Sequence, residues 1–140
     1  PPIYAALCEK VGFDSSLLIR GIEGGVVPSL RQKGLMISYY KNVEKARVEI
    51  DPKLLGINSE LRAIAFPKEF KNGIKRDLLA EYTVNLGCSA LSGETGMFYD
   101  GLVYIASLIL WHVNKVNSIE EGASMVRQTL DSGRALKRLI

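Results

Sequence analysis

Residues 17–29, Leu-Leu-Ile-Arg-Gly-Ile-Glu-Gly-Gly-Val-Val-Pro-Ser, decide how the fold of this chain is interpreted. The apolar run Leu17–Ile19 predicts a strand with both faces buried, and it leads directly into a turn that contains Gly21, Gly24 and Gly25. α/β proteins use a strand followed by glycines to bring the backbone close to a ligand at the carboxyl end of a sheet. We therefore expect a loop of this kind here, formed either to meet phosphate with backbone N–H groups or simply to make a tight turn.

The side chains of this loop offer little metal-binding chemistry. Glu23 is its one carboxylate, and Val26 and Val27 follow where a metal or phosphate site would need oxygen ligands. Glu23 is interpreted either as a ligand contact or as a solvated loop acid.

The composition is that of a globular α/β domain rather than a disordered chain. Of the 140 residues, 47% are hydrophobic and 24% charged, so residues 1–140 are expected to form one domain or part of one. The net charge of +3 is compatible with a phosphate-bearing or nucleic-acid partner, and equally with an ordinary surface. Cys8 and Cys88 lack metal-site spacing, and we expect buried thiols in the cytoplasm or another reducing compartment such as a plastid.

Two further strands, joined as a hairpin, are predicted after the glycine loop. Leu35–Tyr40 and Lys45–Ile50 flank a polar turn, and in the second strand apolar and charged residues alternate strictly. One face of this hairpin should therefore be solvated, as at an antiparallel edge. Because Ser16–Gly21 is apolar enough to need parallel neighbours that the chain does not supply, the sheet is expected to be part of a larger mixed sheet.

Helices are predicted around these strands. Ser118 and Glu121 form a capping box that begins the best-marked helix, and the apolar run Gly101–Val113 predicts a buried helix too short to span a membrane. The remaining helical patterns are Ile3 to about Val11, about Ile74–Leu91 (with Leu78, Leu79, Tyr82, Leu86 and Ala90 on one face), and Arg134–Ile140.

Taken in order, four segments resemble the carboxyl-terminal half of the anthranilate phosphoribosyltransferase family, also called glycosyltransferase family 3. Leu18–Ser29 resembles the family's strand and its Gly-x-Asp-Gly-Leu-Asp-Glu-Ile-Ser loop. Ile50–Gly56 resembles its Pro-Glu-Asp-Phe-Gly-Leu turn. The other two segments are Pro2–Gly12 and Ser118–Leu136, which resemble a helix leading into the sheet and the last helices.

This resemblance implies a phosphoribosyltransferase-like fold and, for the intact family, transfer of a phosphoribosyl group from phosphoribosyl pyrophosphate to an amine in tryptophan biosynthesis. The family's acidic metal-binding pair falls on Val26 and Val27, so the Mg²⁺ expected for the family has no such ligands here and no cofactor is expected in this chain. Glu23 keeps the position of the first acidic residue. The family's phosphoribosyl-pyrophosphate loop lies in an amino-terminal half absent here, so this fragment alone is expected to be inactive.

Basic residues after the loop and in the middle of the chain would make an anion-binding rim if they share a face with the loop, and scattered solubilising charge is the alternative that the pattern favours. They are Arg31, Lys33, Lys75 and Arg76. His112 is the only histidine and is interpreted as a core or helix-terminal residue rather than a base or ligand. With one histidine, no histidine-based metal cluster or catalytic triad is expected.

Two alternatives to a transferase fragment stay open. One is a non-catalytic module that binds nucleic acid or another polyanion, and the other is a scaffold. In the scaffold, a partner chain would cover the exposed apolar face of the sheet. The partner expected for this chain is the amino-terminal remainder of the parent protein or a covering partner chain.

Overall fold

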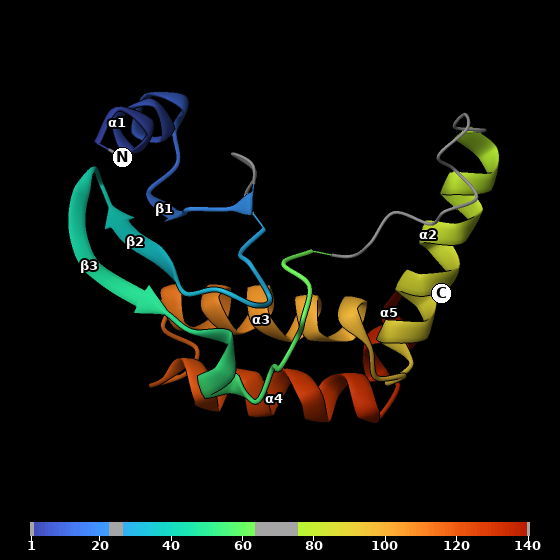
Figure 1. Cartoon of the computed structure of the whole chain (residues 1–140). Helices are drawn as coiled ribbons and strands as arrows, with labels where there is room; N and C mark the ends of the chain where they lie inside the picture. The colour runs from blue at the N-terminus through green and yellow to red at the C-terminus, as the bar shows by residue number, and fades with distance from the viewer. Residues whose placement is uncertain (1, 23–26, 64–75, 140) are drawn as a thin grey trace.

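The computed structural model describes residues 2–22, 27–63 and 76–139. Within them, one antiparallel sheet is built in the order β1-β2-β3 and lies beside a group of helices (Figure 1). The strands are β1 (Ser15–Ile19), β2 (Gly34–Tyr40) and β3 (Val43–Ile50). The helices are α1 (Pro2–Val11), the short 3₁₀ helix η2 (Pro52–Leu55), α2 (Arg76–Leu91), α3 (Met97–His112), α4 (Ile119–Asp131) and α5 (Arg134–Leu139).

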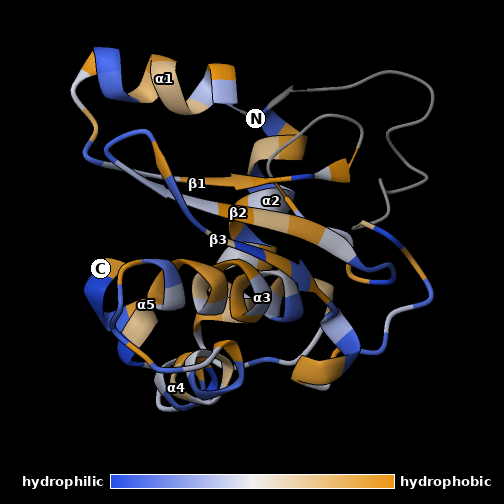
Figure 2. Cartoon of the chain, turned by 90° about the vertical axis from the view of Figure 1, so that its left-hand side faces the viewer, coloured by the Kyte–Doolittle hydropathy of each residue, from blue (hydrophilic) through white to orange (hydrophobic). Residues whose placement is uncertain are grey.

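Helices cover both faces of the sheet. Figure 2 shows α1 on one face and α3 on the other, with α4 beyond α3. Side chains that alternate along the strands divide between these layers, because successive residues of a strand point to opposite faces. Met36 joins the main core with α3 and α4, whereas Ile37 and Tyr39 pack with Ala5 of α1. The predicted α/β architecture, with an edge hairpin covered by helices, is confirmed.

The hairpin forms as its sequence predicts. Lys41 and Asn42 both have positive φ, 46° and 58°, which is the backbone of a type I′ turn matched to the twist of the strands. Ala46, Val48 and Ile50 are at least partly buried, and the charged residues between them are exposed. The β2–β3 register shifts at Ser38/Tyr39, so Lys45 is left without a paired residue, as in a β-bulge.

Helices α3 and α4 pack closely on one another and hold the larger core. Val103 and Leu108 of α3 are fully buried, and α4 contributes Ala123 and Leu130. Ser118 caps α4 by accepting the Glu121 N–H at 3.1 Å. Glu121 in turn accepts from the backbone N–H of Asn117 at 2.8 Å, so the predicted box is present and closes one residue earlier.

Three expectations differ from the structure. The apolar face predicted for α2 is covered only at its carboxyl end, where Ala90 is buried, while Leu78 is 50% exposed. Cys8 and Cys88 are free but only half-buried. In the sheet as described, β1 pairs antiparallel with β2, and no parallel neighbour lies among the described strands.

The helices in the described ranges were also tested for membrane spans, and none of them is long and apolar enough to cross a membrane.

Candidate functional site

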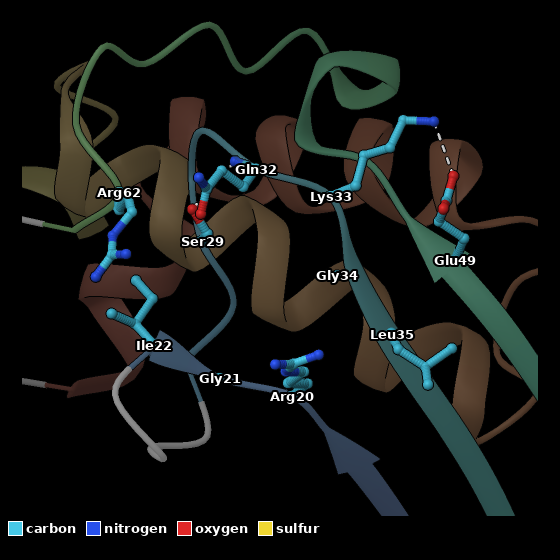
Figure 3. A pocket seen from close by; sticks show the side chains of 10 residues that line it. All are labelled: Arg20, Gly21, Ile22, Ser29, Gln32, Lys33, Gly34, Leu35, Glu49 and Arg62. Atoms are coloured by element: carbon cyan, nitrogen blue, oxygen red, sulfur yellow. Dashed lines mark hydrogen bonds and ion pairs between the residues drawn. The ribbon is translucent and has the colours of Figure 1, made fainter.

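A pocket of about 410 Å³ opens where β1 ends and β2 begins (Figure 3). Its lining includes Gly21 and Ile22, which begin the glycine loop, and Ser29, which ends it. Its lining combines cationic and polar side chains from four segments: the end of β1, the turn before β2, the end of β3 and the chain after η2. These residues are Arg20, Gly21, Ile22, Ser29, Gln32, Lys33, Gly34, Leu35, Glu49 and Arg62.

Backbone hydrogen bonds position the walls of the pocket. The Arg20 N–H donates to the Leu35 carbonyl at 3.0 Å, which continues the ladder one residue beyond β1. The Ile22 N–H donates to the Val27 carbonyl at 3.0 Å and closes the base of the glycine loop. The Leu30 N–H donates to the Arg62 carbonyl at 3.0 Å, so a residue far along the chain is held at the pocket.

Ser29 organises the turn between the loop and β2. Its hydroxyl oxygen accepts the backbone N–H groups of Arg31 at 3.2 Å and Gln32 at 3.1 Å. A serine that binds backbone two and three residues ahead stabilises a tight turn. The turn places Ser29 and Gln32 on the pocket wall opposite Arg20 (Figure 3).

The charge of the pocket is positive on balance, with three cationic side chains against one carboxylate. Lys33 is engaged with that carboxylate: its Nζ lies 2.8 Å from Glu49 Oε1 and 3.8 Å from Asp51 Oδ2. The hydrogen bond to Glu49 raises the pKa of Lys33, which therefore stays charged. Figure 3 shows Lys33 directed toward Glu49 and Arg62 directed toward Ile22. Arg20 and Arg62 bring two further cationic groups to the same lining.

Comparison with known proteins was made over the whole chain. An anthranilate phosphoribosyltransferase of Petrotoga mobilis is 29% identical over 135 residues, which is 96% of this chain and 36% of that protein. The enzyme of the same name from Bacillus cereus is 27% identical over the same shares. An uncharacterized protein of Aquifex aeolicus is 28% identical over 126 residues, 89% of this chain and 36% of that protein. No protein-family model matches.

The resemblance to anthranilate phosphoribosyltransferases is confirmed. The chain spans 36% of the length of these curated relatives. The crystal structure of anthranilate phosphoribosyltransferase from Thermus thermophilus superimposes on 96% of this chain and 36% of its own, with a TM-score of 0.64 at 24% identity, which shows the same fold.

The structure describes some of the residues that were predicted at the metal loop of the anthranilate phosphoribosyltransferases. Gly21 lines the pocket. Val27 is 55% exposed, and its backbone closes the loop. Glu23, Gly24, Gly25 and Val26 lie outside the described residues.

The predicted anion-binding rim is only partly traceable. Lys33 lines the pocket, whereas Arg31 is exposed and is not among the lining residues. Arg76 begins α2, and the position of its side chain is not described; Lys75 lies outside the described residues. The structure adds Arg20 and Arg62, which the sequence analysis missed. Arg20 follows the strand immediately, and this place in the sequence could have identified it. Arg62 reaches the pocket only through a long-range backbone contact.

The donor set of the pocket was compared with the needs of Mg²⁺, which binds oxygen ligands and several waters. In the described part of the chain, no three histidine, cysteine or acidic side chains gather in a way that could hold a metal ion. Glu49, the carboxylate on the pocket wall, is already bound by Lys33. These residues suit an anion better than a divalent cation.

Proposed function

We propose that this chain is the anion-binding portion of an anthranilate phosphoribosyltransferase-like protein, and that the pocket at the end of β1 binds phosphate groups of phosphoribosyl pyrophosphate. The observation that carries the proposal is the convergence of Arg20, Lys33 and Arg62 on one pocket that Gly21 also lines. The names of the relatives supply the substrate class and the link to tryptophan biosynthesis.

The residues of the pocket suit phosphate for distinct reasons. A guanidinium presents several N–H donors in a fixed plane and binds phosphate oxygens in pairs, so Arg20 and Arg62 would fix the orientation of the ligand. Ser29 and Gln32 add polar groups on the opposite wall. Lys33 is shared with Glu49, so an incoming anion would compete with that carboxylate for the lysine.

In phosphoribosyl transfer, the amine nitrogen attacks the ribosyl carbon while the bond to pyrophosphate breaks, and negative charge grows on the leaving pyrophosphate. Cationic side chains aimed at that charge stabilise the transition state. We propose that Arg20 and Arg62 serve this purpose without carboxylate-held Mg²⁺, since valines occupy the positions of the family's acidic pair. The chain spans 36% of the length of its curated relatives, and we propose that it is inactive alone.

Titration calorimetry with pyrophosphate, with and without Mg²⁺, tests the binding site. We expect saturable binding that Arg20→Gln weakens by at least about tenfold, the loss of one charge-assisted contact. Arg31→Gln, an equal change of net charge outside the pocket, is the control and should bind as the wild type. Equal weakening by both variants, or binding that requires Mg²⁺, would contradict the proposal.

The activity is tested separately, on the longest natural protein that contains this chain. Anthranilate, phosphoribosyl pyrophosphate and Mg²⁺ are supplied, and product is measured by fluorescence. Turnover at an ordinary enzymic rate that depends on Mg²⁺ would show that the metal site is intact and would overturn its proposed loss.

A second candidate function, binding of nucleic acid or another polyanion, is favoured by one feature of the hairpin. Tyr40 is 47% exposed, and the Nζ atoms of Lys41 and Lys45 lie 5.7 and 5.9 Å from the centre of its ring. An exposed ring beside lysines is a stacking platform for a single-stranded base. Binding of this kind should weaken steeply with added salt, because phosphate contacts release counterions. A flat salt response would exclude it.

A further inference from the structure

A second polar constellation lies at the opposite end of the same strands from the cationic pocket. The Ser15 hydroxyl oxygen lies 2.7 Å from His112 Nε2, and the Ser38 hydroxyl oxygen lies 2.8 Å from His112 Nδ1. Both nitrogens of the imidazole are therefore held by serine hydroxyls. The sequence analysis took a single histidine to exclude a triad; the structure shows that one histidine is enough for a Ser–His–Ser arrangement.

Three elements far apart in the sequence build this arrangement. Ser15 opens β1, Ser38 lies in β2, and His112 is the last residue of α3. Ser15 pairs with Tyr40 and Ser38 with Leu17, so the two serines lie on the face of the sheet that α3 covers. The β-bulge at Ser38/Tyr39 is adjacent, and such irregularities frequently redirect side chains at sites.

Burial fixes the protonation state of the histidine. Desolvation lowers the pKa of His112, so the imidazole is neutral at neutral pH and has one nitrogen free to accept a proton. We assign the hydrogen to Nδ1, where it is donated to Ser38, and leave Nε2 to accept the Ser15 hydroxyl proton. Ser15 also faces the Tyr39 carbonyl, but at 3.4 Å this is the weaker partner.

A cavity of about 680 Å³ gives a substrate access to Ser15. All three residues of the constellation line it, together with Trp111 and Tyr40, which add two aromatic residues to the lining. Lys45 and Asn114 line the same cavity and carry N–H donors suited to a developing negative charge. Ser15 itself is exposed, whereas Ser38 is only 8% exposed.

We propose that Ser15 is a nucleophile, that His112 is its general base, and that Ser38 is the positioning residue that holds the imidazole. The substrate class is a small carboxylic ester with an aromatic group, which the cavity wall would bind. A nucleophile and base within hydrogen-bond reach, with the base oriented by a third group, is the diagnostic arrangement for covalent catalysis. This site is independent of the proposed anion pocket.

The chemistry balances with water as the only co-reactant. Ser15 Oγ bonds to the ester carbonyl carbon while its proton moves to His112 Nε2, and the carbonyl electron pair moves to oxygen. The tetrahedral species collapses, the C–O bond to the alcohol breaks, and the departing oxygen takes the proton from Nε2. Water, deprotonated by Nε2, then attacks the acyl-serine, which releases the acid and returns the proton to Ser15.

The test is acylation of the full chain by p-nitrophenyl acetate and its phosphonylation by a fluorophosphonate, which loses fluoride, with the modified residue located by peptide mass spectrometry. We expect label on Ser15, its loss in Ser15→Ala, and labelling about 100-fold slower in His112→Gln, the typical contribution of a general base. Ser16→Ala, in the neighbouring position on the opposite sheet face, is the matched control and should label as the wild type. Ser38→Ala should slow acylation without changing the half-saturating concentration, and Ser38→Thr should restore it.

A second measurement needs no substituted protein. Because the chain has one histidine, diethyl pyrocarbonate modifies a single imidazole, and this treatment should stop labelling until hydroxylamine reverses it. The proposal would be overturned by label found on residues other than Ser15, or by labelling of Ser15→Ala equal to that of the wild type. Labelling that continues after the imidazole is modified would overturn it as well.

Discussion

The Tyr99 hydroxyl donates a hydrogen bond to the Asp131 carboxylate at 2.8 Å and so ties the beginning of α3 to the end of α4. Tyr104, on the same helix, is 1% exposed, and among the described residues its hydroxyl is the one buried side-chain polar atom without a hydrogen-bond partner. The hydroxyl of Tyr99 therefore has a hydrogen-bond partner, and that of Tyr104 has none among the described residues.

Replacing Tyr99 with phenylalanine should destabilise the fold. The substitution removes a hydrogen bond to a charged acceptor and leaves the Asp131 carboxylate with one donor fewer, so we expect the free energy of unfolding to fall by about 1.5–3 kcal/mol. Urea unfolding followed by circular dichroism measures this change. Tyr4→Phe, at an exposed position, should stay within about 0.5 kcal/mol of the wild type.

The same substitution at Tyr104 should have the opposite sign. Phenylalanine keeps the packing of the ring and removes a polar group that is buried without a partner, so we expect a stability unchanged or raised by up to about 1 kcal/mol. A loss as large as that of Tyr99→Phe would contradict this, because it would mean that the Tyr104 hydroxyl has a partner.

Alkaline pH should weaken the fold through Tyr99. Burial, with the hydrogen bond to Asp131, raises the pKa of Tyr99 to about 12 from 10.0. The unfolded chain releases this proton first, so the contribution is complete below pH 10 and is lost as the pH rises toward 12. The measurement is the difference in unfolding free energy between the wild type and Tyr99→Phe as a function of pH, which cancels the other alkaline groups. A difference that does not change between pH 9 and 12 would refute the linkage.

Gly122 should resist a substitution that Gly87 accepts. A Cβ on Gly122 of α4 would lie 3.1 Å from the Ser107 carbonyl oxygen and 3.2 Å from the Ser107 Cα on α3. The overpacking outweighs the helix propensity gained, and we expect Gly122→Ala to destabilise by about 1 kcal/mol. Gly87 in α2 has open space around it, so Gly87→Ala should stabilise by about 1 kcal/mol. Thermal unfolding of both variants tests the pair, and an equal gain in both would show that the helices can separate.

Local patterns predicted most of the fold, because strands, turns and caps depend on residues close in sequence. The alternation along 45–50 and the cap at Ser118 are confirmed for this reason. The spacing of apolar residues along α2 predicted a buried face, and this was correct only near Ala90. Periodicity shows which residues share a helix face, but not whether another element covers that face. The cationic pocket was anticipated through Gly21 and Lys33, but Arg62 depends on a backbone contact to Leu30 that no local pattern encodes.

The His112 constellation lay outside sequence reasoning for the same physical reason. Ser15, Ser38 and His112 carry no motif, and only the antiparallel register and the end of α3 bring them together. Their chemistry becomes visible when tertiary contacts are known.

Acid titration should report the environment of His112 directly. Since burial lowers its pKa, the NMR resonances of this single imidazole should titrate with a midpoint below the ordinary 6.5. The unfolded chain then binds the proton more readily than the native chain, so stability falls as the pH drops below 6.5 through the folded pKa. In the unfolded protein in urea the midpoint should return to about 6.5. A midpoint above 6.5 in the folded chain would show that the charged imidazole is favoured.

The outer face of α1 should make the isolated chain associate. Ile3, Leu7 and Val11 are spaced four residues apart on one helix face and are 75%, 52% and 75% exposed. An apolar stripe of this kind is typical of a surface that another protein segment covers. We expect concentration-dependent self-association in analytical ultracentrifugation, abolished by Leu7→Lys together with Val11→Lys. Leu54→Lys, at an exposed leucine on η2, adds a positive charge outside this stripe and should leave association unchanged. If Leu54→Lys abolished association equally, net charge rather than the α1 stripe would be its cause.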